Sequence, residues 1–203
     1  MEIRDTYRTI SQPFKEVLFK EKNSKFFGYA YHVSKEEDVK YHLETLKKQH
    51  RTAGHWCYAY HIGVDDVKYR TNDDGEPKNS AGIPIFGQIQ SFELTNVLIV
   101  VVRYFGGTKL GISGLINAYK KTANLVLTES KIVKKTLSID YAIIFDYQNM
   151  NRVMRVIKEK KLHIIKQVLE MKCNINIRVR KKDAFSVYET FSNLHEIVIK
   201  KID

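Results

Sequence analysis

The sequence predicts an α+β protein with two domains, residues 1–137 and residues 138–203. In the first domain, Val97 to Val102 form an unbroken and mostly β-branched apolar run, which is typical of a short buried strand. In the second, the hydrophobic periods predict the order β-α-β-β-α-β, the split βαβ arrangement of a ferredoxin-like domain. A chain of 203 residues with 43% hydrophobic content is long enough to bury a proper core.

The first half of the first domain alternates between strand-like and helix-like patterns. Strands are expected at Phe14–Lys20, Lys25–His32, His55–His61 and Val67–Arg70. Between the second and third of these, Ser34 and Glu37 form a capping-box pattern, which predicts a helix ending near Gln49. On the third strand, one face would carry His55, Cys57, Ala59 and His61.

A polar loop and a glycine-punctuated turn follow. The loop, Thr71 to Gly82, is interrupted by Pro77 and precedes a helix expected over Ile83–Phe92. The strand that begins at Val97 should end in Arg103, Tyr104 and Phe105, and the turn after it holds Gly106, Gly107, Gly111 and Gly114. From about Ser113 a helical period predicts an inward face of Leu115, Ala118, Tyr119, Thr122, Leu125 and Val126. Residues 128–135 read as a charged connection that ends this helix.

The second domain begins with a strand at Ser138–Tyr147 and a helix at Asn149–Lys161. The helix should turn Met150, Val153, Met154 and Ile157 inward. A hairpin of Leu162–Met171 and Asn174–Arg180 is expected to turn at Lys172 and Cys173. Asp183 then caps a helix that reaches about Leu194, and Glu196–Ile202 closes the domain as a strand.

Composition limits the class of protein. The formal net charge of +11 favours a polyanionic partner such as RNA or a ribosomal surface. The basic excess is shared between the two predicted domains. The two cysteines, Cys57 and Cys173, are far apart, which favours neither a disulfide framework nor a zinc site and fits a reducing cytoplasm. No apolar run approaches the length of a membrane span, and the first residues lack the apolar core of a signal peptide.

Two groups of residues are weak candidates for chemistry. Asp73, Asp74 and Glu76 lie close together, and Asp74 and Glu76 in particular could hold Mg²⁺ or act as an acid–base pair. Acidic turn residues are more often simply solvated, so we expect no metal and no cofactor. His55 and Cys57 could form a nucleophilic pair, but neighbours on one strand face rarely adopt the required geometry, and a cysteine packed in the core is favoured.

The turn after the buried strand is the strongest candidate. Arg103 and Lys109, beside turn amides and a helix N-terminus, would form an anion-binding site together with Tyr104 and the four glycines. Alternatively, Arg103 extends toward solvent and pairs with a carboxylate of the polar loop, and the glycines serve only packing. Because none of the common nucleotide, hydrolase or metalloprotease motifs is present, the residues indicate no reaction.

The segments DDGEPKNSAGIPIF (Asp73 to Phe86) and VLIVVVRYFGGTKLGISGLINAYKK (Val97 to Lys121) resemble the signature of the YigZ/Impact family. NSKFFGYA (Asn23 to Ala30) and HWCYAY (His55 to Tyr60) resemble its N-terminal blocks. The resemblance implies a first domain like domain 2 of ribosomal protein S5 and a ferredoxin-like second domain similar to domain V of elongation factor G. It carries over motif positions but no catalytic residues: Asp73, Asp74, Gly75, Glu76 and Pro77 in the loop, and Arg103, Tyr104, Gly106, Gly107, Gly111 and Gly114 in the turn.

Two functions are consistent with these residues. The first is a non-enzymatic, cytoplasmic regulator of translation that binds RNA, the ribosome or a protein of translational control, as the charge and the resemblance imply. The second is an enzyme for a phosphorylated or nucleotide substrate. It would hold Mg²⁺ on Asp74 and Glu76 and phosphate on Arg103 and the Gly106–Gly107 turn.

Overall fold

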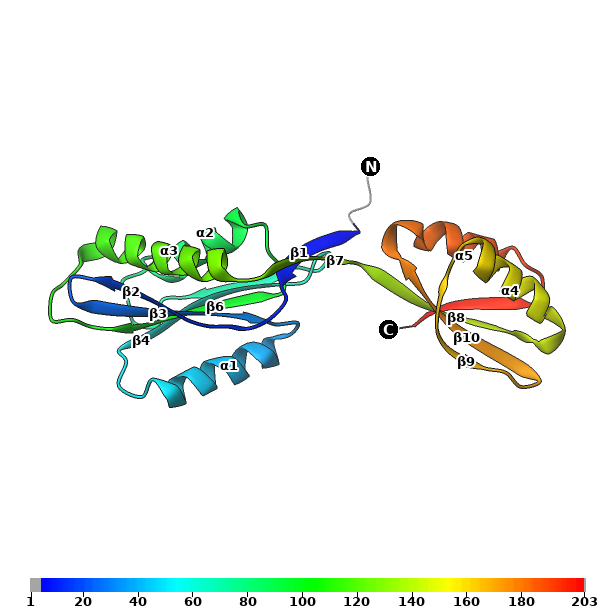
Figure 1. The fold of residues 1–203 in the computed structure, drawn as a ribbon, viewed down its shortest axis with the longest axis horizontal. Helices are drawn as coiled ribbons and strands as arrows, with labels where there is room; N and C mark the ends of the chain where they lie inside the picture. The colour runs from blue at the N-terminus through cyan, green and yellow to red at the C-terminus, as the bar shows by residue number, and fades with distance from the viewer. Residues whose placement is uncertain (1–4, 203) are drawn as a thin grey trace. The chain divides into compact units, whose positions relative to one another are not determined.

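The computed structural model describes residues 5–202, except for the side chains of Phe14 and Lys15. Met1 to Arg4 and Asp203, which the predicted domain ranges include, lie outside the described residues. The chain forms two compact units, one of residues 8–134 and one of residues 5–7 with 135–202. Both are mixed α+β units with antiparallel sheets, as Figure 1 shows.

The larger unit is built on a five-stranded sheet in which all neighbouring strands are antiparallel. Its strands, in sheet order, are β2 (Phe14–Glu21), β3 (Ser24–His32), β6 (Val97–Tyr104), β4 (His55–Ile62) and β5 (Lys68–Asn72). The central strand is the apolar run from Val97, and its first seven residues are buried. A strand covered on both faces needs apolar residues at every position, which is why the run does not alternate.

Helices cover both faces of this sheet. The helices α2 (Gly82–Ser91) and α3 (Gly111–Glu129) lie on one face and α1 (Glu36–Gln49) on the other (Figure 1). Separate apolar clusters fill the two sides. A Cβ at Gly28 of β3 would lie 2.4 Å from Val126 and 2.8 Å from Thr122 of α3, so the close approach of helix and sheet requires glycine here.

Local predictions for this unit need three corrections. The N-terminus of α1 is capped by Asp38, whose carboxylate accepts the N–H groups of Ser34 and Lys35, and not by a Ser34–Glu37 box. The predicted inward residues of α3 are buried, except Leu125, which is 37% exposed because that edge of the helix is open. Strand β5 continues to Asn72, so the polar loop is shorter than predicted.

A pair of strands near the boundary of the units was not predicted. β1 (Thr6–Ile10) and β7 (Ile132–Thr136) form a two-stranded sheet. The segment interpreted as a charged connection therefore contains a strand. Its partner lies more than 120 residues earlier in the chain, and local sequence patterns carry no signal for such a pairing.

The smaller unit contains a four-stranded antiparallel sheet in the order β11-β8-β10-β9. The strands are β8 (Ser138–Asp146), β9 (His163–Val168), β10 (Lys172–Arg180) and β11 (Ile197–Ile202). The helices are α4 (Met150–Glu159) and α5 (Ala184–Ser192), preceded by single turns at Tyr147–Asn149 and Lys181–Asp183. Along the chain this gives the predicted order β-α-β-β-α-β.

One detail of the hairpin is wrong in the prediction. The chain turns at residues 169–171, and Lys172 and Cys173 already belong to β10. Cys173 is fully buried in the apolar cluster between this sheet and its helices, because alternate residues of β10 face that cluster. Within the described part of the chain, no helix is long and apolar enough to cross a membrane.

Candidate functional site

The polar loop and the glycine turn meet at a buried ion pair. The Arg103 guanidinium, near the end of β6, donates through Nη1 to Glu76 Oε1 at 2.7 Å. The side chains are only 6% and 3% exposed, so the interaction takes place away from bulk water. A buried charge is tolerated in a protein interior when an opposite charge and hydrogen bonds compensate its lost hydration. Glu76 therefore neutralises Arg103 inside the molecule.

Two further buried groups complete this cluster. The Tyr119 hydroxyl of α3 donates to the same Glu76 oxygen at 2.7 Å. The Cys57 thiol of β4 lies 3.3 Å from the Tyr119 oxygen and 3.0 Å from the Asp73 carbonyl oxygen. Burial raises the pKa of both the Cys57 thiol and the Tyr119 hydroxyl, and the nearby Glu76 carboxylate adds to both shifts. A thiol held neutral in this way is a poor nucleophile.

Aromatic rings enclose the Arg103 guanidinium. Its central carbon lies 5.5 Å from the ring centroid of Phe26 and 5.6 Å from that of Phe105. Nη2 is 3.4 Å from the Ser24 hydroxyl oxygen, whereas the buried Nε has no hydrogen-bond partner among the described residues. Such stacking attracts a cation and shields it from water. The guanidinium is thus fixed in place and closed off from solvent.

The loop reaches this cluster because its two aspartates bind backbone groups. Asp73 accepts the N–H groups of Asn79, Ala81 and Gly82, which closes the loop onto the start of α2. Asp74 Oδ2 accepts the Trp56 N–H at 2.7 Å, and the Asp74 carbonyl oxygen lies 2.8 Å from His55 Nδ1. Neither carboxylate is simply solvated. Together they bind the loop to the edge of β4 and place Glu76 over Arg103.

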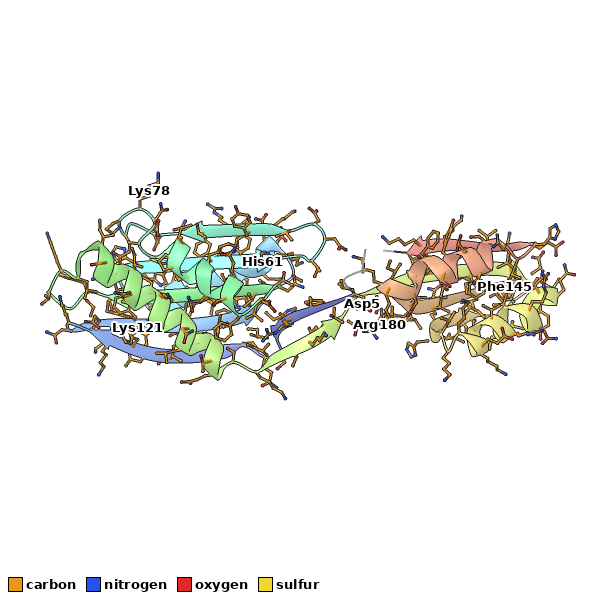
Figure 2. All side chains as sticks on the ribbon, turned by 90° about the horizontal axis from the view of Figure 1, so that it is seen from above. Asp5, His61, Lys78, Lys121, Phe145 and Arg180 are labelled. Atoms are coloured by element: carbon orange, nitrogen blue, oxygen red, sulfur yellow. The ribbon has the colours of Figure 1, made fainter. Side chains whose placement is uncertain are left out.

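His55 lies at the rim of the cluster. Its Nε2 is 4.0 Å from Glu76 Oε1, and its side chain is 26% exposed. Gly75, with φ of +86°, passes over the imidazole, and its own conformation favours glycine. Beyond it the loop turns outward through the exposed residues Pro77 and Lys78, and Figure 2 shows Lys78 pointing away from the sheet.

The glycines of the turn have different tasks. A Cβ at Gly106 would lie 2.1 Å from the Asn23 backbone, and the Gly106 N–H donates to the Ser24 hydroxyl at 3.2 Å. Gly107 and Gly111 have φ values of +85° and +73° with open space where a Cβ would stand. Gly114 approaches the Leu110 side chain. Gly107, Lys109 and Gly111 are exposed, whereas Tyr104 is partly buried with its hydroxyl 3.0 Å from His50 Nδ1.

The structure thus brings together only some of the predicted site residues. Arg103 pairs with Glu76, as one alternative anticipated, but it is buried and does not extend to solvent. An anion-binding role stays a prediction for the exposed turn residues Gly107, Lys109 and Gly111. Over residues 5–202, no group of three or more His, Cys, Asp or Glu is arranged to hold a metal ion. Cys57 packs in the core, as favoured from the sequence.

Sequence reasoning did not identify Tyr119 and Ser24 as members of this cluster. Tyr119 was predicted only as an inward residue of α3, and it lies 43 positions from Glu76 in the sequence. Ser24 falls in the short connection between the two strands predicted at Phe14–Lys20 and Lys25–His32. The hydroxyl of a buried tyrosine usually has a hydrogen-bond partner, so the sequence indicated that Tyr119 would have one. It did not indicate which residue that partner would be.

Comparisons with known proteins agree with this architecture. Residues 22–127 match the model of the Impact N-terminal domain, which spans the loop, the turn and their buried pair. The chain is 33% identical over 163 residues to "IMPACT family member YvyE" of Bacillus subtilis, covering 80% of this chain and 74% of that protein. It is 29% identical over 201 residues to an "IMPACT family member" of Haemophilus influenzae, covering 94% and 96% of the two chains.

A solved structure is also similar. The "Crystal structure of an hypothetical protein" superposes with a TM-score of 0.72 at 23% identity and covers 99% of both chains. At this identity the likeness bears on the fold alone. The match to the domain model and the relative at 33% identity together show that the chain belongs to the YigZ/Impact family.

Proposed function

We propose that this protein is a non-enzymatic regulator of translation that binds RNA or the ribosome. One observation carries the proposal: the buried arginine is neutralised internally, while the positive excess lies on the surface. No lysine whose burial is described is buried, and the chain as a whole carries a formal net charge of +11. Exposed and distributed cations suit a polyanionic surface, because each phosphate contact releases bound counterions.

Family membership supports the same class of function. Eukaryotic members that the sequence resembles are associated with translational control, and the two fold types that the resemblance implies are found in proteins that act on RNA or the ribosome. The strand order β11-β8-β10-β9, with both helices in the intervening connections, supports a ferredoxin-like fold for residues 138–203. We assign residues 1–137 to an Impact-type domain with the S5-like fold as part of the same proposal.

The enzymatic alternative finds less support in the geometry. Its Mg²⁺ would bind Asp74 and Glu76, but Glu76 already accepts from Arg103 and Tyr119, and Asp74 accepts from the Trp56 backbone. Phosphate at Arg103 would have to displace Glu76 from a buried pair, which would leave that carboxylate uncompensated. Two buried free thiols, Cys57 and Cys173, fit the reducing cytoplasm in which we place the protein.

The proposal is tested by equilibrium binding to structured RNA and to purified ribosomes at several salt concentrations. We expect the logarithm of the association constant to fall linearly with the logarithm of salt concentration, because the contacts are to phosphates. The variant Lys109→Gln, in the exposed turn, should weaken binding modestly and make this dependence shallower. Absence of binding, or an affinity that does not change with salt, would overturn the proposal.

A further inference from the structure

A groove lies on the α2–α3 side of the larger unit, and its lining includes neither Arg103 nor Glu76. It has a volume of about 430 Å³, within the range of small-molecule and cofactor pockets. Its lining comes from β2, α2 and α3, and consists of Phe19, Gln88, Asn117, Lys120, Lys121, Asn124 and Leu125. None of these seven residues is acidic. The groove therefore has a positive balance that no lining carboxylate offsets.

One face of α3 forms most of this surface. Asn117, the pair Lys120 and Lys121, and the pair Asn124 and Leu125 recur at intervals of three to four residues, which places them along one face of the helix. Leu125, predicted to point inward, is one of them, and its 37% exposure is exposure to this groove. Its open position therefore gives the groove an apolar contact surface.

Three carboxamides supply hydrogen-bonding groups of both kinds. Gln88 of α2 is only 7% exposed, and its Oε1 accepts from Asn124 Nδ2 at 3.1 Å. That bond orients both amides, and Asn117 adds a third, exposed one. Asparagine and glutamine side chains each carry a donor and an acceptor, so one carboxamide can bind both kinds of group on a nucleobase edge.

The remaining lining residues supply a stacking surface and two cations. The Phe19 ring of β2 is partly buried against the core, and Lys121 Nζ lies 5.6 Å from its centroid. Figure 2 shows Lys121 on the side of α3 nearer β2. Lys120 is the exposed neighbour of Lys121 on the same helix. An aromatic or apolar platform beside lysines is the arrangement that binds single-stranded nucleic acid, because bases stack while phosphates contact the cations.

We propose that this groove binds one nucleotide of a single-stranded RNA. The base lies against Phe19 and Leu125 with its edge toward the carboxamides of Gln88, Asn117 and Asn124, and the adjoining phosphates contact Lys120 and Lys121. The inference rests on the proposed RNA-binding function and adds a defined place and a single-stranded substrate class to it.

The first test compares two doubly substituted full-length chains with equal net charge. Lys120→Gln with Lys121→Gln removes the groove cations, and Lys47→Gln with Lys48→Gln removes two exposed neighbours on α1, across the sheet. Binding of a labelled single-stranded oligonucleotide is measured at several salt concentrations. The groove variant should show a log–log salt slope shallower by about 1.4, the value for two lost single-strand contacts, whereas the α1 variant keeps the wild-type slope.

The second test locates the base. A 5-iodouridine-containing oligonucleotide is photo-crosslinked to the wild-type chain, and the modified peptides are identified by mass spectrometry. We expect the crosslink at Phe19 or in the α3 segment that carries Leu125. Phe19→Leu, which keeps an apolar residue against the core, should weaken binding about 10-fold through lost stacking, and a far-UV circular dichroism spectrum like that of the wild type at the binding temperature is the control for folding.

The outcomes separate the two proposals. If wild-type protein binds neither RNA nor ribosomes, the proposed function fails and the groove assignment fails with it. If RNA binds with the expected salt dependence but the groove and α1 variants have equal slopes, or the crosslink lies outside the groove, only the present inference is overturned. If mononucleotides compete with the oligonucleotide at equal affinity per nucleotide, the groove takes a free nucleotide and the RNA assignment is wrong.

Discussion

The two units contain the same kind of ion pair in opposite surroundings. In the larger unit, Arg103 on β6 binds Glu76 with side chains 6% and 3% exposed. In the smaller unit, Arg178 on β10 binds Asp140 on β8 through two 2.8 Å contacts, with side chains 54% and 26% exposed. The second pair is bidentate, with two guanidinium nitrogens each contacting one carboxylate oxygen, yet water competes for both partners. Burial, more than geometry, decides what each pair does for its unit.

The difference in burial implies that the buried charges stabilise the fold, whereas exposed charges are available to bind a partner. The buried pair joins the motif loop to the glycine turn and presents no charge to a partner. Exposed cations keep their charge available, which is what binding to a polyanion requires. Motif residues and binding residues therefore need not be the same residues in this protein.

The largest expected effect is that of breaking the buried pair. Glu76→Ala should lower the free energy of unfolding of the larger unit by about 3–5 kcal/mol, because Arg103 is left buried without a counter-charge. Trp56, the only tryptophan in the chain, lies in this unit beside the Asp74 carboxylate, so its fluorescence reports the urea midpoint of this unit. A loss below about 1 kcal/mol would show that the pair behaves like a surface pair.

The glycine turn should give the next largest effect. Gly106→Ala places a Cβ against the Asn23 backbone and should cost about 1–3 kcal/mol, as overpacking does. Gly107→Ala meets open space and is strained only by its positive φ, so about 1 kcal/mol is expected. Urea midpoints of the two variants, followed by Trp56 fluorescence, test the order. The reverse order would mean that backbone conformation, and not close approach, dominates the turn.

The stability of the larger unit should depend on pH because of a buried histidine, His50. His50 is buried, with Nε2 2.6 Å from the Tyr29 oxygen, and burial lowers its pKa below the ordinary value of 6.5. The unfolded chain then binds the proton more readily, so stability falls as the pH drops below 6.5. Urea midpoints at pH 7.5 and 5.5 should therefore differ more for wild type than for His50→Gln. Equal differences would contradict this assignment.

The smallest effect should come from the exposed pair. Asp140→Asn is expected to change the stability of the smaller unit by about 0–1 kcal/mol, since solvent screens the interaction. The hydrogen bond from Arg178 lowers the pKa of Asp140. The contribution of this ion pair to stability is therefore present at neutral pH and is lost as the pH falls through the lowered pKa of Asp140. Far-UV circular dichroism during thermal unfolding measures the change. A loss comparable to that of Glu76→Ala would overturn the comparison.

Much of this fold could be predicted from local sequence patterns. The apolar run from Val97 predicted the central strand, and helical periods located α3 and α4 because each buries a stripe of residues. The pairing of β1 with β7 could not be predicted, since it joins two segments more than 120 residues apart in the chain. The prediction for Leu125 was wrong because a helical period indicates which residues share the apolar face of a helix. It does not indicate how far the neighbouring elements cover that face.

The candidate site was predictable in part. The acidic loop and Arg103 could be paired as alternatives from their charges, but the choice of Glu76 depends on how Asp73 and Asp74 bind backbone N–H groups. Those bonds depend on the folded positions of α2 and β4. The groove could not be predicted at all, because Phe19, Gln88 and Asn124 come from three elements with no shared motif.

The most direct test of the account is the RNA affinity of a chain carrying both Arg103→Met and Glu76→Met, measured across salt concentrations. Replacing both partners of a buried pair by apolar residues of similar size is often tolerated. We predict a folded protein whose affinity and salt slope equal those of the wild type, since neither residue contacts RNA. A folded double variant with weaker binding and a shallower slope would show that Arg103 is itself an RNA ligand, and would contradict the account.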